Sequence, residues 1–272
     1  MNQRSRTGLF IAVLFMGLGF VGRLPAAPLD LAVPWGTDEK DPLILQGDYV
    51  PPQREGAPVL IALHGLGSDR AEWRPLAAAA QKRGWGVCLY DARGHGKSRA
   101  TLTGKAVNHE DRAQRRPAFW FGMMDDLARA SRAVEDRGVP PARQVWVGAS
   151  LGANVCLLTA SRGVLPGALV LMSPGLDYAG LEVDEIPARL RTPMLFVSAQ
   201  PDTYAHISAE RLLGQADPGR SKWIALEKGT ARGAHGTQLF DEKLEGKMLD
   251  WVGRVMKMDQ PRSAGGAPKP KR

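Results

Sequence analysis

Ser150 stands between two glycines in the stretch WVGASLGANV, which covers residues 146 to 155. The spacing Gly-x-Ser-x-Gly, here from Gly148 to Gly152, suits a sharp strand-to-helix turn that pushes a serine hydroxyl out above a sheet. A hydroxyl held in this way can act as a nucleophile when a base stands beside it. The pattern alone is weak in a chain with 31 glycines, and a tight turn around an unreactive serine is the alternative. The apolar run before the serine and the helix-like run after it favour the reactive serine.

Six apolar runs predict the strands that would carry this turn: 57 to 65, 84 to 94, 143 to 150, 167 to 175, 192 to 202 and 221 to 229. Their hydrophobicity is continuous rather than alternating, which is typical of strands covered on both faces. Helices are expected between them at 71 to 83, 119 to 137, 151 to 162 and 206 to 215, with a last one from 238 to about 257. The alternation predicts an α/β fold: a mostly parallel, doubly wound sheet with helices on both faces.

Polar side chains follow the ends of these expected strands. Ser150 follows the third strand, Asp177 the fourth, Asp202 the fifth and His235 the last. Ligands of such sheets bind at the carboxyl ends of the strands, so these residues are expected on one rim. The rim would bring a serine, an acid and a histidine together in that order along the chain.

Five short motifs resemble those of the α/β-hydrolase superfamily and stand in the family's order: LHGLGS, YDARGHGKS, GASLG, SAQPD and GAHG. The resemblance covers nearly the whole body of the chain, from about residue 43 to residue 258. It implies that Ser150 is the nucleophile, His235 the base and Asp202 the acid that orients the imidazole. It also implies an oxyanion hole made by the backbone N–H groups of Leu66 and Leu151.

Some of these assignments have alternatives in the sequence. Asp177 also follows a strand-like run and could serve as the acid, although Asp202 is favoured. His235 could be a histidine of a surface loop. Of the other histidines, His64 is expected to brace the loop that follows it by hydrogen bonding, and His95 is expected to be structural.

Several residues near the motifs are expected to have structural roles. Asp91 and Arg93 are close enough along the chain to satisfy each other. The two cysteines, Cys88 and Cys156, lie in apolar runs and are expected to be buried thiols. The stretch FWFGMM, from 119 to 124, is expected to be buried more than to line a pocket. The polar loop from 97 to 117 could overhang the site.

The resemblance implies hydrolysis of carboxylic esters or thioesters through an acyl-enzyme on Ser150, with no cofactor and no metal. The stretch between Asp177 and Thr192 is too short for a large cap domain. The layout is therefore similar to that of compact esterases and dienelactone hydrolases, although the latter typically carry cysteine at the nucleophile position. A small peptidase, an acyltransferase and a non-catalytic binding protein of the same fold are the alternatives.

The ends of the chain differ from its body. The formal net charge of +8 comes mostly from the two ends, so the body is nearly neutral and nucleic-acid binding has no special support. Residues 1–27 combine a basic start, an apolar run and small residues, and predict a signal peptide or an N-terminal anchor of an exported protein. Residues 28–258 would form one hydrolase domain, and residues 259–272 a disordered basic tail. The partner is expected to be a small-molecule or acyl ester substrate, and the oligomeric state stays open.

Overall fold

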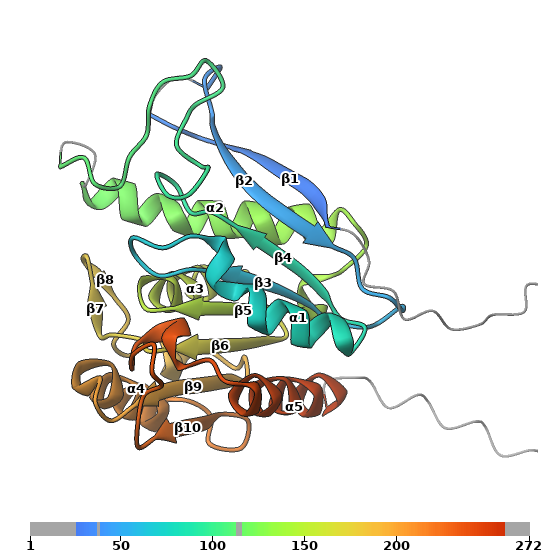
Figure 1. Ribbon diagram of the computed structural model, residues 1–272, viewed down its shortest axis with the longest axis vertical. Coiled ribbons are helices and arrows are strands. Elements are labelled where there is room, and N and C mark those ends of the chain that lie inside the picture. Colours follow the sequence, from blue (N-terminus) through green and yellow to red (C-terminus); the bar gives the residue numbers. More distant parts are fainter. Residues whose placement is uncertain (1–25, 37–38, 113–115, 259–272) are drawn as a thin grey trace, which may run out of the picture.

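An eight-stranded sheet forms the centre of the computed structural model, which describes residues 26–36, 39–112 and 116–258 (Figure 1). The order of its strands is β1-β2-β4-β3-β5-β6-β9-β10. Their bounds are β1 (Ala27–Val33), β2 (Leu43–Val50), β3 (Val59–Leu63), β4 (Gly86–Tyr90), β5 (Gln144–Ala149), β6 (Ala168–Met172), β9 (Met194–Ala199) and β10 (Lys222–Leu226). The strands from β4 to β10 run parallel, whereas β2 pairs antiparallel with both β1 and β4. The predicted α/β fold class is confirmed, and all six predicted strands are present.

Helices cover both faces of the sheet. On one face lie α1 (Arg74–Lys82) and α5 (Glu242–Met258), and on the other lie α2 (Pro117–Glu135), α3 (Leu151–Ser161) and α4 (Thr203–Gln215). Successive side chains of a strand point to opposite faces. In β3, Val59, Ile61 and Leu63 accordingly join the core beneath α2, α3 and α4, while Leu60 and Ala62 join the core beneath α1 and α5. Both faces of the central strands are therefore buried, which explains their continuous apolar runs.

Several expected helices differ in their bounds from the structure; α1, for example, begins at Arg74 rather than at residue 71. The last predicted helix was to begin at residue 238, but a 3-10 turn occupies Gly236–Leu239 and α5 begins only at residue 242. Asp241 explains the later start, because its carboxylate accepts a hydrogen bond from the Leu244 N–H at 2.6 Å and so caps the first turn. Conversely, α4 begins at Thr203, directly after Asp202, which is earlier than predicted.

The antiparallel pair β1–β2 was not predicted. Its strands are covered on one face only: in β1, Leu29, Leu31 and Val33 are buried beneath α2, and the residues between them are exposed. Such one-sided burial produces an alternating pattern, which a search for continuous apolar runs does not detect.

Part of the polar loop that follows β4 packs against the start of β2. Its Leu102 N–H donates to the Pro42 carbonyl at 2.8 Å, and its Ala100 carbonyl accepts from the Ile44 N–H at 3.2 Å. Part of the segment that was expected to overhang the site therefore lies beside the start of β2, near the β1 edge of the sheet (Figure 1).

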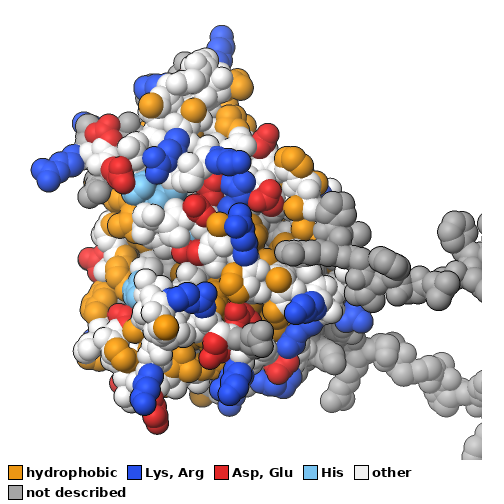
Figure 2. Space-filling view, viewed as in Figure 1, with side chains coloured by type: hydrophobic (Ala, Val, Ile, Leu, Met, Phe, Trp, Pro, Cys, Tyr) orange, Lys and Arg blue, Asp and Glu red, His pale blue; other side chains and the backbone are white. Residues whose placement is uncertain are grey.

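The signal segment and the basic tail predicted for the two ends fall, apart from Ala26 and Ala27, outside the described residues. Among the residues that are described, no helix has the length and apolar character needed to cross a membrane. On the face that carries α1 and α5, Lys and Arg side chains are interspersed with Asp and Glu (Figure 2).

Candidate active site

Ser150 occupies a strained turn between β5 and α3. Its backbone has φ 53° and ψ −121°, a left-handed conformation that is rare for a residue with a side chain. Both flanking positions require glycine, because neighbouring backbone atoms leave no room for a Cβ. A Cβ on Gly152 would lie 2.3 Å from the Leu63 carbonyl oxygen, and one on Gly148 would lie 2.4 Å from the Gly152 carbonyl oxygen. The turn leaves Ser150 partly exposed at the carboxyl end of the sheet.

His235 and Asp202 are hydrogen-bonded to each other. Nδ1 of His235 lies 2.6 Å from Oδ2 of Asp202. The carboxylate is largely shielded, with 16% of its side chain exposed, whereas the imidazole is 41% exposed and open to a substrate. Asp202 comes from the turn between β9 and α4, and His235 from the loop after β10.

The His235 loop is fastened beside the serine turn. The N–H of Gly236 donates to Oγ of Ser173 at 2.8 Å, and Ser173 directly follows β6. A Cβ on Gly236 would lie 3.4 Å from that of Ala149, the residue before Ser150. Within the described part of the chain no hydrogen bond joins Ser150 to His235. The three residues nevertheless follow the carboxyl ends of β5, β9 and β10 in one parallel part of the sheet.

Asp177, the alternative acid, is engaged elsewhere. It is exposed in the short strand β7 (Asp177–Tyr178), which pairs with β8 (Leu181–Glu182), and its Oδ1 accepts from the Gly180 N–H at 2.8 Å. This bond closes the β7–β8 turn. Asp202 is thus the aspartate in contact with His235.

The expected oxyanion donors flank Ser150 on its β3 side. Leu151 is the first residue of α3, so its N–H has no partner within the helix. The loop that contains Leu66 is held by Glu72, whose two carboxylate oxygens accept from the Gly65 N–H at 3.1 Å and the Ser68 hydroxyl at 2.5 Å. A Cβ on Gly65 would lie 3.4 Å from that of Ser150, so this loop lies directly against the serine.

A sequence profile of the alpha/beta hydrolase family matches residues 59–259 of this chain. The chain belongs to the alpha/beta hydrolase family. The uncharacterized protein YfhR of Escherichia coli K12 is 30% identical over 167 residues, which are 57% of this chain and 53% of YfhR. The chain thus spans about half the length of the curated relatives it matches.

Solved structures share the fold of this alpha/beta hydrolase. TT1662 from Thermus thermophilus has a TM-score of 0.64 at 18% identity, over 87% of this chain and 99% of that protein. The Pyrococcus furiosus esterase PF2001 has a TM-score of 0.62 at 16% identity, over 86% of this chain and 92% of the esterase. At such identities the likeness concerns the fold.

His64 braces the hydrolase's Leu66 loop, as expected. Its Nδ1 donates to the Gly65 carbonyl at 2.7 Å, and its Nε2 accepts from the Ala92 N–H at 2.9 Å. Both ring nitrogens are thus used, and burial lowers the pKa of His64, which keeps the ring neutral. His95 is also buried, and burial lowers its pKa to about 3. These histidines are structural.

The expectation that Asp91 and Arg93 satisfy each other is wrong. Arg93 forms a buried, two-bonded ion pair with Asp126 of α2, with distances of 2.7 and 2.6 Å. Asp91 instead pairs with the Arg70 guanidinium and accepts from the backbone N–H groups of Arg70 and Lys97, both at 2.8 Å. Sequence proximity was misleading here because neighbouring residues of the loop point to opposite sides.

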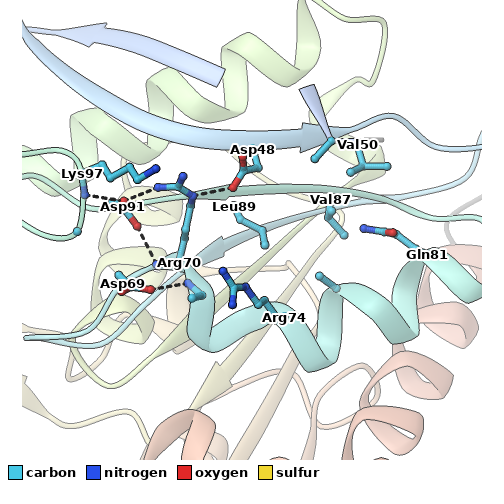
Figure 3. A pocket seen from close by; sticks show the side chains of 14 residues that line it. Asp48, Val50, Asp69, Arg70, Arg74, Gln81, Val87, Leu89, Asp91 and Lys97 are labelled. Atoms are coloured by element: carbon cyan, nitrogen blue, oxygen red, sulfur yellow. Dashed lines mark hydrogen bonds and ion pairs between the residues drawn. The ribbon is translucent and has the colours of Figure 1, made fainter. Parts of the chain in front are cut away.

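Asp91 and Arg70 belong to the wall of a hollow of about 570 Å³ between α1, β2 and β4 (Figure 3). Arg70 crosses this hollow and bonds Asp48 as well as Asp91. The lining includes none of Ser150, Asp202 and His235, so the hollow is separate from the candidate active site.

Burial of the two cysteines and of most of FWFGMM is confirmed, with Phe121 partly exposed. Among the described residues no group of three His, Cys, Asp or Glu side chains could hold a metal ion. Sequence reasoning missed Ser173, which holds the histidine loop, and Tyr178, whose ring lies beside that of His235. The only sequence signal for either residue was its position after a predicted strand, since neither belongs to one of the motifs.

Proposed function

We propose that this protein is a serine hydrolase that cleaves carboxylic esters or thioesters through an acyl-enzyme on Ser150. The observation that carries the proposal is the hydrogen bond between Asp202 and His235 beside a serine in a strained turn. A donor bond to Asp202 keeps the proton on Nδ1 of His235, so Nε2 has a lone pair that can accept the proton of the serine. The esterase among the structural relatives agrees with this reading.

The first half-reaction transfers the acyl group to the enzyme. Oγ of Ser150 attacks the carbonyl carbon while Nε2 of His235 takes the hydroxyl proton. The negative charge on the carbonyl oxygen is stabilised by the N–H groups of Leu66 and Leu151. The bond to the leaving group then breaks, and His235 returns the proton to it.

The second half-reaction releases the acid. Water enters the place of the leaving group, and His235 takes its proton as it attacks the acyl carbon. The bond to Oγ of Ser150 breaks and the proton returns to the serine. In a free enzyme, contacts of this kind are often long and form fully only with substrate bound, which suits the missing Ser150–His235 bond.

Covalent labelling tests the proposal directly. The folded protein is treated with a fluorophosphonate and the adduct is located by mass spectrometry, with Ser150→Ala as the matched control. One adduct on Ser150, absent in the control, is expected, together with turnover of p-nitrophenyl acetate that the same substitution abolishes. A folded protein that stays unlabelled would instead be a non-catalytic member of the family.

A further inference from the structure

The segment from Gly175 to Leu181 carries β7 and packs beside α3 (Figure 1). The buried side chain of Asn154, one turn into α3, holds both of its ends. Oδ1 of Asn154 accepts from the Gly175 N–H at 3.2 Å, and its Nδ2 donates to the Leu181 carbonyl at 2.8 Å. The helix that begins at the serine turn therefore also positions this segment.

Helix α4 holds the same segment from the other side. The Tyr204 hydroxyl accepts from the Asp177 N–H at 2.9 Å and donates to the Asp177 carbonyl at 3.0 Å. The Tyr204 ring meets that of Tyr178 edge-on, with centroids 5.6 Å apart. A Cβ on Gly175 would lie 2.7 Å from both rings, so the glycine is what allows this packing. The position of Tyr178 is thus set by the framework.

The phenol of Tyr178 points at the reacting groups. Its hydroxyl donates a long hydrogen bond to the Ser173 carbonyl at 3.4 Å and lies close enough to the Ser150 side chain to interact with it. Its ring is perpendicular to that of His235, with centroids 6.3 Å apart. Burial, with a smaller contribution from nearby Asp202, raises the pKa of Tyr178 well above its usual value. The hydroxyl therefore keeps its proton, and because its bond to the Ser173 carbonyl is longer than usual, a better-placed acceptor on a bound substrate could take that proton's hydrogen bond.

The order of the strands in the sheet determines which part of a bound substrate lies near the Tyr178 hydroxyl. β5 lies between β3 and β6, and the oxyanion loop follows β3. Tyr178 follows β6, on the same side of Ser150 as Asp202 and His235, which follow β9 and β10. When the carbonyl oxygen of the substrate points toward Leu66, the bond to the leaving group lies on the opposite side of Ser150. His235 delivers its proton on that side.

Resting on the proposed function, we infer that the Tyr178 hydroxyl donates a hydrogen bond to the leaving atom, and that the natural substrates are oxygen esters of ordinary alcohols. When the C–O bond breaks, its electron pair goes to the leaving oxygen and Nε2–H of His235 gives that oxygen its proton. Tyr178 keeps its own proton and stabilises the charge that develops meanwhile. A hydrogen bond from Tyr178 stabilises a strongly basic leaving oxygen most and the less basic oxygen of a nitrophenolate less. It stabilises a leaving sulfur least, because sulfur is a weak hydrogen-bond acceptor.

Three acetyl esters with the same acyl group test this inference: phenyl acetate, p-nitrophenyl acetate and S-phenyl thioacetate. Tyr178→Phe removes the hydroxyl and keeps the ring. It is expected to lower kcat/KM for phenyl acetate by about tenfold, and for the other two by no more than about threefold. kcat/KM reports the acylation step, in which the leaving group departs.

The matched control is Tyr90→Phe in β4, which removes a buried hydroxyl that has no hydrogen-bond partner among the described residues and should leave kcat/KM for all three esters unchanged. Fluorophosphonate labelling of Ser150 in Tyr178→Phe shows that the variant is folded, because fluoride leaves without help from the phenol. Equal losses on the three esters, or none, would overturn the role of Tyr178. A wild-type protein that neither labels nor hydrolyses any ester would contradict the proposed function itself.

Discussion

The Asp202 carboxylate bonds Nδ1 of His235 at 2.6 Å although the two residues are 33 positions apart. Asp202 also precedes the first turn of α4, where an aspartate commonly caps the helix, yet its side chain makes no capping hydrogen bond. The carboxylate is directed to the imidazole instead of the helix. Because Asp177 is used in its own turn, the two aspartates can be separated by experiment.

Asp202→Asn is expected to reduce the kcat of p-nitrophenyl acetate hydrolysis by about a thousandfold or more. The amide can present its NH₂ group to Nδ1 and favour the wrong tautomer of His235. Asp177→Asn should change kcat by less than about threefold, because its side chain only closes the β7–β8 turn. Equal losses in the two variants would mean that the acid is assigned wrongly.

Gly152→Ala is expected to lower the free energy of unfolding by about 3 kcal/mol, because the added Cβ would lie 2.3 Å from a β3 carbonyl oxygen. Gly246→Ala is the matched control: no atom lies within 4 Å of its added Cβ, and Gly246 lies within α5. It should raise stability by about 0.5–1 kcal/mol through helix propensity. Urea unfolding measures both, and comparable effects of the two substitutions would argue against the close approach at the turn.

Asn154→Leu should cost about 2 kcal/mol of stability, because it leaves the buried Gly175 N–H and Leu181 carbonyl without partners. It should also lower kcat/KM for phenyl acetate, since the segment that carries Tyr178 loses both of its hydrogen bonds to Asn154. Thr159→Val, a buried change in the same helix that removes only a bond to Val155, should leave kcat/KM unchanged. Retention of full activity by Asn154→Leu would show that the segment is positioned by other contacts.

Asp126→Ala is expected to destabilise the fold by about 3–5 kcal/mol, because it leaves the buried Arg93 guanidinium without its partner. The double variant Arg93→Met with Asp126→Leu should recover most of that loss, since no charge remains buried. Arg189→Ala, which breaks an exposed pair with Glu185, should change stability by less than about 1 kcal/mol. Thermal unfolding distinguishes these cases, and a small effect of Asp126→Ala would contradict the burial of the pair.

His95 makes the stability depend on pH on the acid side. Its pKa is about 3 in the fold and 6.5 in the unfolded chain, so the unfolded state binds the proton more readily. Stability is fully present above pH 6.5 and falls as the pH drops toward 3, with a slope of up to about 1.4 kcal/mol per pH unit from this group. His95→Gln should therefore flatten the pH dependence of urea unfolding between pH 6.5 and 4.5, with His64 supplying part of the remainder. An unchanged slope would exclude His95 as its source.

Much of the fold follows from local patterns in the sequence. Continuous apolar runs predict the parallel strands because these are buried on both faces, and Gly148, Ser150 and Gly152 predict the sharp turn because backbone conformation is set locally. Strands β1, β2, β7 and β8 were not predicted from the sequence. Two of them are covered on one face only, and the other two are two residues long.

The sequence by itself determined which residues lie at the carboxyl rim of the sheet, because that depends on the order of strands and the residues that end them. Only the tertiary structure decided which of them touch. It selected Asp202 over Asp177 as the partner of His235, separated Asp91 from Arg93, and brought Tyr178 to Ser150. The reason is that such contacts depend on how remote segments pack and on which way a loop turns its side chains, and neither is encoded in the spacing along the chain.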